Sequence, residues 1–346
     1  MADLVQPIAP EGAKARVLVA GGTGYAGALA AELAWKHPYL ELVRVTSRSE
    51  NGRRISDLYP RYEVPLELAE LDLADLDDVE VGIVAYPHGA AAPVVAEMRG
   101  RGLLVVDLSA DFRFDNLPDY EKSYGTHSEP ELLDGAVYGL PEINREQVAG
   151  AELVANPGCY PTASILALAP LAEAGLIEDV VIDAKSGVSG AGRGGGEGTT
   201  FTTITENVSA YKPSGHRHRP EIREKLSDLS PDGTAPDRLT FVPHLVPVDQ
   251  GELVSCYVTP RREIDQAELD GIFASAYSSE PFVRLRDVPP GMRDVRETNQ
   301  CHIMPLVTDD RILVLSAIDN LWKGASSQAI QNLNLMLGVN ESEGLR

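Results

Sequence analysis

Short apolar runs alternate with helical patterns through the first half of the chain. Helical periodicity covers 25–36 and 90–101, and runs short enough for buried strands lie before and after each pattern. Because parallel neighbours in a sheet need a crossover that is usually a helix, this order predicts an α/β domain with a doubly wound parallel sheet. The predicted strands are 16–20, 40–45, 81–86, 103–108 and 151–155.

The pattern changes after a long helical stretch over 163–174. Apolar and polar positions then alternate in several runs, with one helix that begins at about 220 and another over 265–275. Alternation of this kind is typical of mixed or antiparallel sheets, so it predicts an α+β domain. The predicted strands are 180–185, 239–242, 252–258, 302–306 and 312–317.

An amphipathic pattern over 325–337 predicts a last helix. Asp319 or Asn320 stands where a side chain could cap its start. The helix comes too late to extend the second sheet, so we expect it to return to the first domain. A length of 346 residues agrees with two domains. The expected boundaries are 1–157 with 320–346 for the first domain, and 158–319 for the second.

A glycine-rich stretch joins the first predicted strand to the first predicted helix. Gly21 permits a tight turn, Gly24 lets the backbone approach a pyrophosphate, and Gly27 lets the helix pack on the strand. The helix N-terminus then faces the phosphates. Strand, glycines and helix in this order predict a dinucleotide site. Its expected contacts are Gly21, Gly22, Thr23, Gly24, Tyr25, Ala26 and Gly27.

The end of the second predicted strand bears on which dinucleotide binds. An NAD enzyme usually places Asp or Glu there, on the ribose hydroxyl, whereas this chain has Ser47, Arg48 and Ser49. A hydroxyl and a guanidinium suit a 2′-phosphate, so NADP is favoured over NAD; the alternative is that Arg48 is only exposed. Pro87 opens the loop after the third strand, and we assign that loop to the same ligand crevice.

Cys159 follows a Pro-Gly pair at the start of the long helical pattern. We expect it on a tight turn or in the first helical turn, where unpaired N–H groups favour the thiolate. Thr162 is expected to help satisfy those donors. The alternative is a buried cysteine in a loop. Cys256 and Cys301 are interpreted as core residues.

The net charge of −22 argues against general affinity for nucleic acid or anionic membranes. No apolar run reaches the roughly 18 residues of a membrane span, and 1–14 look like a loose leader without the features of a secretory signal. The three cysteines lack metal or disulfide spacing, which favours the cytoplasm.

In a chain with this net negative charge, an anionic ligand would need a local cluster of positive charge. The candidates are Lys185, Arg193, Lys212, Arg217, Arg219, Arg223 and Lys225.

Two histidines, His216 and His218, flank Arg217 where a loop enters a helix. A histidine at such a junction can act as a general acid or base, and the arginine beside it can bind an anion. The alternatives are a basic surface loop or a metal site. No third metal ligand is apparent and the arginines repel cations, so we expect no metal.

Arg113 lies after the fourth strand and is a candidate phosphate ligand, because its planar fork fits two oxygens at once. A salt bridge to a neighbouring aspartate is the alternative. The glycine-rich stretch 186–198 is interpreted either as a flexible lid or as a backbone cradle for an oxyanion.

Taken together, these motifs resemble the N-acetyl-gamma-glutamyl-phosphate reductases of arginine biosynthesis, in order and over about 16–340 of the chain. The resemblance implies a Rossmann-type NADP-binding domain, an α+β catalytic domain of the aspartate-semialdehyde dehydrogenase type, NADPH as cofactor, and a homo-dimer or homo-tetramer. The stretches that carry it are 21–27, 87–89, 106–113, 156–161, 186–193, 215–218 and 319–321.

The resemblance also implies a mechanism. Cys159 attacks an acyl phosphate, phosphate leaves, and the resulting thioester accepts hydride from NADPH to give a semialdehyde. His218 is the expected general acid or base, with His216 as the second choice. Asn320 is expected near the cofactor. The residues expected to contact substrate are Ser109, Arg113, Asn156, Ser189, Arg193 and Arg217.

Three alternatives stay open. The reductase of carrier-protein-linked glutamyl or aminoadipyl phosphate is a close relative, and the stretch 211–215 looks somewhat like that branch. An aspartate-semialdehyde dehydrogenase fits less well, because the His-Arg-His triplet and 106–113 point elsewhere. A non-catalytic NADP-sensing regulator would explain the glycines but not a cysteine at a helix start beside basic histidines.

Overall fold

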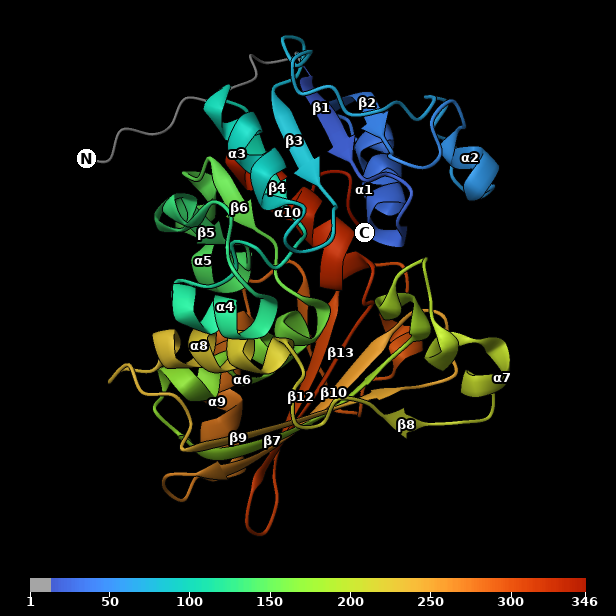
Figure 1. Cartoon of the computed structure of the whole chain (residues 1–346). Coiled ribbons are helices and arrows are strands. Elements are labelled where there is room, and N and C mark those ends of the chain that lie inside the picture. Colours follow the sequence, from blue (N-terminus) through green and yellow to red (C-terminus); the bar gives the residue numbers. More distant parts are fainter. Residues whose placement is uncertain (1–13) are drawn as a thin grey trace, which may run out of the picture. The chain divides into compact units, whose positions relative to one another are not determined.

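The computed structural model describes residues 14–346 (Figure 1), so the leader expected over 1–14 lies outside the described residues except for its last position. The chain divides into two compact units. The first runs up to Pro157 and resumes over Ala325–Arg346, and the second is Gly158–Gly324. No helix within 14–346 has both the length and the apolar character that crossing a membrane requires.

The first unit is built on a six-stranded sheet with the order β2-β1-β3-β4-β6-β5. Every neighbouring pair is parallel, so the predicted doubly wound parallel sheet is confirmed. One strand, β5, was not predicted, because three residues after a 3-10 turn carry no readable period. The strands are β1 (Ala15–Ala20), β2 (Leu40–Thr46), β3 (Val81–Val84), β4 (Leu104–Asp107), β5 (Ala136–Tyr138) and β6 (Leu153–Ala155).

Helices cover this sheet, and the last one comes from the end of the chain. Helix α10 packs on α1, α5 and β4, so the prediction that it returns to the first unit is confirmed. It starts later than expected, because a π-helical turn over Trp322–Ser326 precedes it. The helices are α1 (Tyr25–Lys36), α2 (Ile55–Leu58), α3 (Ala92–Gly100), α4 (Leu117–Tyr124), α5 (Pro141–Ala149) and α10 (Ser327–Met336).

The cap expected for the last helix is wrong in its position. The N-cap residue of α10 is Ser326, whose hydroxyl donates to the carbonyl of Ala26. Asp319 caps the π turn instead, because its Oδ1 accepts from the backbone N–H groups of Leu321 and Trp322. The sequence pattern cannot distinguish a π turn from the first turn of an α-helix.

The second unit is built on a seven-stranded sheet with the order β11-β12-β13-β10-β7-β9-β8; its mixed character agrees with the alternating pattern, but the short edge strands β8 and β11 were not predicted. Helix α6 packs on the central strands β10 and β13 and contacts α8 and α9. The helices are α6 (Cys159–Glu173), α7 (Phe201–Ile204), α8 (His218–Leu229) and α9 (Gln266–Tyr277). The strands are β7 (Ile177–Ser186), β8 (Ser209–Ala210), β9 (Arg238–Leu245), β10 (Glu252–Pro260), β11 (Val283–Leu285), β12 (Cys301–Val307) and β13 (Ile312–Ile318).

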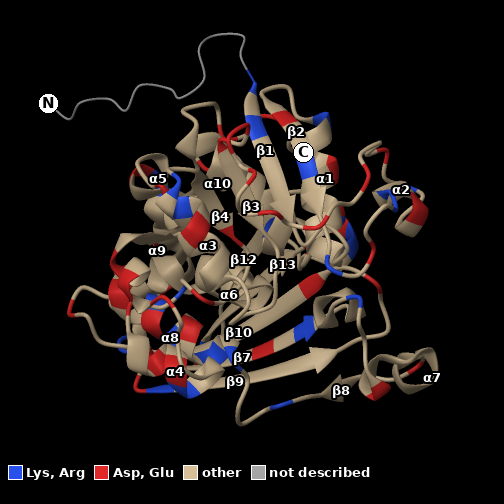
Figure 2. Ribbon diagram, turned by 45° about the horizontal axis from the view of Figure 1, so that its top comes forward, with Lys and Arg blue, Asp and Glu red and all other residues tan. Residues whose placement is uncertain are grey.

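The other two cysteines lie in the core, whereas acidic residues lie on several helices (Figure 2). Cys256 and Cys301 are buried in β10 and β12, so their interpretation as core residues is confirmed. Figure 2 shows acidic residues on several helices, among them α4, α8 and α9. On α4 and α9, residues such as Asp119 and Asp270 are exposed, as expected of a solvated acidic surface.

Candidate active site

The turn between β1 and α1 needs two of its glycines for its own packing. Gly21 has a φ of +91°, and a Cβ there would lie 2.7 Å from the carbonyl oxygen of Ala85. A Cβ on Gly27 would lie 2.2 Å from the carbonyl oxygen of Gly21. Both distances are far below van der Waals contact, so a side chain at either position would force this first turn apart.

Gly24 is different, because packing within the protein does not require a glycine at this position. A Cβ on Gly24 would find no atom closer than 3.9 Å, and its φ of −73° is open to any residue. Gly24 is also the N-cap of α1, where no side chain caps the first-turn N–H groups. A glycine that internal packing does not require, beside uncapped donors, fits the close approach of a pyrophosphate.

The end of β2 presents the predicted hydroxyl and cation. The Ser47 hydroxyl is buried and accepts from the backbone N–H groups of Ser49 and Glu50, both at 3.2 Å. Arg48 is exposed, and its guanidinium carbon lies 5.1 Å from the centre of the Tyr86 ring. Stacking on an aromatic ring restrains an arginine without using its hydrogen-bond donors, so Arg48 suits a phosphate ligand.

The loop after β4 is fixed by its own hydrogen bonds. The Ser109 hydroxyl donates to Asp107 at 2.5 Å and accepts from the backbone N–H of Asp111 at 3.0 Å. Arg113 is buried and donates to the carbonyls of Asn156 and Leu108, each at 2.8 Å. Burial raises the pKa of Asp107 to about 7. Ser109 and Arg113 therefore shape the loop, and their contact with substrate stays a prediction.

Asn156 supports the segment that leads to Cys159. Its side chain is buried, with Nδ2 donating to the carbonyl of Ala325 at 3.1 Å. Its Oδ1 accepts from Asn332 of α10, also at 3.1 Å. This amide thus ties the end of β6 to the start of the returning helix within the first unit. The substrate contact expected of Asn156 stays a prediction.

Cys159 is the first residue of α6, and the prediction of a cysteine at a helix start is confirmed. Its side chain is half-buried, unlike the other two cysteines, so a reagent can reach it. The N-cap Gly158 has no side chain, and its backbone N–H donates to the buried carboxylate of Glu221 at 3.1 Å. The role expected of Thr162 is wrong, because its hydroxyl donates to the Gly158 carbonyl and satisfies an acceptor.

Both predicted histidines lie against the residue that follows Cys159. The Tyr160 ring centre is 5.7 Å from that of His216 and 5.9 Å from that of His218, and the rings meet edge to face. The two histidine rings are 4.9 Å apart. Phe241 of β9 packs on both Tyr160 and His216. The fold of the second unit therefore brings the start of α6 and the start of α8 together.

The two histidines differ in their surroundings. His216 accepts the backbone N–H of His218 on Nδ1 at 3.2 Å. Burial, with Lys212 and Arg217 nearby, lowers the pKa of His216 to about 4. A neutral histidine that already caps a helix is poorly suited to move protons near pH 7, which favours His218 for that task.

Other predicted residues hold loops of the second unit. Asn320 is buried; it accepts the Gly251 N–H at 2.8 Å and donates to Ser189 at 3.0 Å. The Ser189 hydroxyl in turn donates to the carbonyl of Asp249 at 2.6 Å. The cofactor contact expected of Asn320 and the substrate contact expected of Ser189 stay predictions. The stretch 186–198 forms the short 3-10 turns Val188–Ala191 and Glu197–Thr199, with Arg193 exposed between them.

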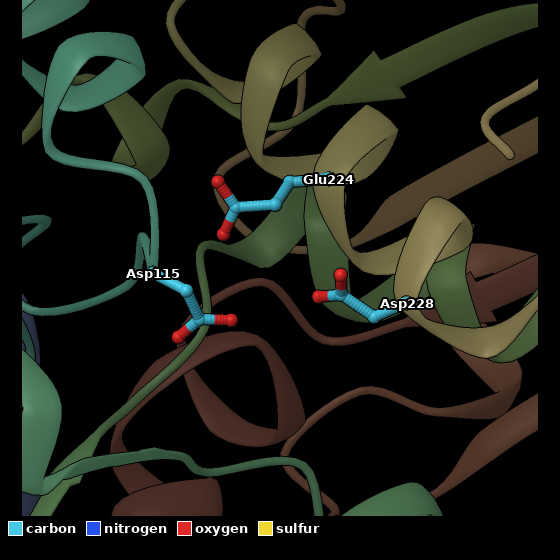
Figure 3. A group of neighbouring side chains, drawn as sticks. All are labelled: Asp115, Glu224 and Asp228. Atoms are coloured by element: carbon cyan, nitrogen blue, oxygen red, sulfur yellow. The ribbon is translucent and has the colours of Figure 1, made fainter. Parts of the chain in front are cut away.

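Several cations of the expected positive cluster have partners inside the unit. Lys185 pairs with Asp183 at 2.5 Å, and Arg219 and Arg223 donate to backbone carbonyls. Lys225 contacts Glu224 at 2.9 Å and Asp228 at 3.3 Å. Figure 3 shows these last two carboxylates on α8. Asp115, also drawn there, belongs to the first unit, and we assign no metal site to the three.

Sequence reasoning missed two neighbours of Cys159. Glu252, the first residue of β10, is completely buried; neither of its carboxyl oxygens has a hydrogen-bond partner among residues 14–346, and the Cys159 side chain acts to lower its pKa. Gly324 lies so close that a Cβ there would be 2.8 Å from the Cβ of Cys159. The available signal was a carboxylate that opens an otherwise apolar strand pattern. No local pattern around Gly324 indicated its contact with Cys159.

Comparison with known proteins agrees with this arrangement. The chain matches the family models "Semialdehyde dehydrogenase, NAD binding domain" over 16–151 and "Semialdehyde dehydrogenase, dimerisation domain" over 159–320. Its fold is similar to that of aspartate semialdehyde dehydrogenase II from Vibrio cholerae, with a TM-score of 0.72, 19% identity, and coverage of 94% of this chain and 99% of that chain.

Two curated relatives carry the same name. The chain is 49% identical to N-acetyl-gamma-glutamyl-phosphate reductase of Desulforudis audaxviator, covering 95% of this chain and 97% of the relative. It is 45% identical to that of Halorhodospira halophila, covering 94% and 96%. With identity this high along nearly the whole length of both proteins, the chain belongs to the N-acetyl-gamma-glutamyl-phosphate reductase family.

Proposed function

We propose that this protein reduces N-acetyl-gamma-glutamyl phosphate to N-acetylglutamate semialdehyde and phosphate with NADPH, as a cytoplasmic enzyme of arginine biosynthesis. The observation that carries the proposal is Cys159, a half-buried thiol at the start of α6, beside two histidines of the same unit. The curated relatives supply the substrate, and the thiol supplies a nucleophile for its acyl carbon.

NADP binding is assigned to the first unit. The residues there fit the cofactor, because Gly24 leaves room for a pyrophosphate at the uncapped start of α1 and Arg48 offers a cation for the 2′-phosphate. NADPH, when bound, supplies the hydride. The unit from Gly158 to Gly324 is assigned the chemistry and, from its match to a dimerisation domain, self-association as a homo-dimer or homo-tetramer.

The second unit performs the covalent steps in this proposal. The Cys159 thiolate attacks the acyl carbon, the C–O bond to phosphate breaks, and a thioester forms on the sulfur. Reduction of that thioester and cleavage of its C–S bond release the semialdehyde and restore Cys159. His218 donates a hydrogen bond or a proton to the substrate oxygen, and Arg193 and Arg217 meet the anionic groups.

The reverse reaction tests this function. Purified enzyme given N-acetylglutamate semialdehyde, NADP and inorganic phosphate is expected to form NADPH, and the rate should depend on phosphate because phosphate must cleave the thioester. Absorbance at the nicotinamide band measures the rate. A carrier-protein-linked semialdehyde is offered in parallel, and a strong preference for it would replace the free N-acetyl substrate. Binding of NADP without turnover of either substrate would favour the sensor.

Replacing Arg48 with Ala is expected to weaken NADPH binding about 10- to 100-fold, since it removes charge-assisted hydrogen bonds to the 2′-phosphate. NADH, which lacks that phosphate, should change by less than about threefold. Fluorescence titration of both cofactors gives the dissociation constants. Arg54→Ala, on an exposed arginine of the same loop region, is the matched control. Equal weakening of both cofactors would contradict the assignment of Arg48.

A further inference from the structure

Glu252 is a carboxylate in a row of side chains that is otherwise apolar. Side chains alternate along a strand, so Glu252 shares a face of β10 with Val254, Cys256 and Val258. All of them are buried, and Glu252 itself has no exposed surface. Strand β10 is central, paired with β7 on one side and β13 on the other. A charge at such a position is costly, and packing does not explain its presence.

The buried face of β10 lies against α6, and the Glu252 carboxyl meets the nucleophile there. The Cys159 side chain acts to lower the pKa of Glu252, and neither carboxyl oxygen of Glu252 has a hydrogen-bond partner among residues 14–346. The other titratable groups that face it are Tyr160, Tyr211 and Asp319. Burial raises the pKa of both tyrosines and of Asp319 above their ordinary values.

These surroundings set the protonation state of Glu252. Burial, with a smaller contribution from Asp319, raises its pKa to about 8, close to the ordinary value of 9.0 for a thiol. Proton exchange between two groups is least costly when their pKa values are similar. Tyr160 and Tyr211 do not compete for the proton of the thiol, because their raised pKa values keep both hydroxyls protonated near pH 8. His216 is neutral and already bonded to the start of α8.

We propose that Glu252 is a catalytic residue that takes the proton of the Cys159 thiol and later returns it. The inference rests on the proposed covalent function. In the first half-reaction the S–H bond breaks, the proton moves to the carboxylate, and the sulfur bonds to the acyl carbon while phosphate departs and takes a proton from solvent. In the second, the reduced adduct loses its C–S bond, the aldehyde leaves, and the sulfur regains the proton from Glu252.

In this proposal His218 acts on the substrate oxygen and Glu252 acts on the sulfur of Cys159, so different residues carry out the two proton transfers. This division explains why an ionisable group is retained on the buried face of β10. It also predicts that the thiol and the carboxyl titrate as a coupled pair, with two apparent pKa values that belong to the pair.

The test is alkylation of Cys159 by iodoacetamide across pH, in enzyme without cofactor or substrate. Cys256 and Cys301 are buried, so the rate reports on Cys159, and Cys159→Ser gives the background. The wild type is expected to show two ionisations, the lower one near pH 8. Glu252→Gln should show a single ionisation and lose turnover about 100-fold or more. Glu252→Asp, which keeps a carboxyl, should retain two ionisations.

Controls separate this outcome from simple disruption. Glu173→Gln removes a carboxyl at the far end of α6, where burial also raises the pKa of the glutamate, and should leave the profile unchanged. Identical alkylation profiles for the wild type and Glu252→Gln would overturn the proposal. Because alkylation needs no substrate, this result is independent of whether the proposed acyl phosphate is correct.

Stability provides a second check that also shows whether Glu252→Gln folds. Because the pKa of Glu252 rises from 4.5 to about 8 on folding, the folded state holds its proton more tightly, and raising the pH between these values destabilises the wild type. Glutamine does not titrate, so Glu252→Gln should escape this destabilisation. Its melting temperature should therefore rise relative to that of the wild type as the pH is raised from about 5 to about 8. A constant difference would overturn the raised pKa on which the proton exchange depends.

Discussion

Replacing Cys159 with Ser is expected to lower turnover at least about 10³-fold, since a serine hydroxyl is a far weaker nucleophile near pH 7 than a thiolate. Serine has nearly the same shape as cysteine, so the substitution leaves the close packing of the residue 159 Cβ beside Gly324 unchanged. NADPH affinity should stay within about twofold, because the residues assigned to the pyrophosphate and the 2′-phosphate belong to the first unit. Steady-state rates and cofactor titration measure the two effects.

Cys256→Ser is the matched control, because that cysteine is buried in β10 and has no assigned role in the reaction. Its turnover should stay within about threefold of the wild type, although the polar hydroxyl in the core lowers stability. Mass spectrometry after mixing with acyl phosphate, without NADPH, should show an adduct on the wild type that Cys159→Ser lacks. Near-normal turnover of Cys159→Ser would contradict the covalent route.

The second large effect separates two glycines of one turn. Gly27→Ala should lower the melting temperature by about 5 °C or more, because the new Cβ would lie 2.2 Å from the backbone oxygen of Gly21. Gly24→Ala should fold normally, since its Cβ would find nothing closer than 3.9 Å. The same methyl group lies where the pyrophosphate approaches, so NADPH binding should weaken about 10- to 100-fold.

Thermal unfolding and cofactor titration of both variants give the answer. Gly24 is an N-cap, where alanine is somewhat less favourable than glycine, so a change of about 2 °C is the most that capping alone would produce. Normal NADPH affinity in a stable Gly24→Ala protein would show that the cofactor does not approach this glycine, and the placement of the pyrophosphate would then be wrong.

Local patterns were sufficient for most of the fold. Strands β1 to β4 and the helices α1 and α3 follow from apolar periodicity, and the glycines and Cys159 follow from turn and helix-start chemistry. Strand β5 has only three residues and forms because it pairs with β6. A pairing between separate segments leaves no pattern in the sequence of either one. The π turn before α10 likewise depends on tertiary packing.

Contacts between distant residues could not be predicted in this way. Glu252 meets Cys159 only because α6 packs on β10, and that packing is not visible in either segment alone. The Thr162 hydroxyl could have met a donor or an acceptor, and the geometry of the first turn of α6 decided for the Gly158 carbonyl. Asn156 and Arg113 read as ligands from their residue types, yet burial gave both of them partners within the protein.

The first unit is interrupted by the second, and this has a consequence for biosynthesis. Its parallel sheet leaves the ribosome complete, but α10, which covers α1, α5 and β4, is synthesised only after the whole of Gly158–Gly324. The surface that α10 will cover therefore stays bare on the nascent chain while the inserted unit is made. Domains tend to fold as units during synthesis, so the inserted unit can fold before the first unit is complete. Until the last helix emerges, the uncovered surface of the first unit exposes the nascent chain to aggregation.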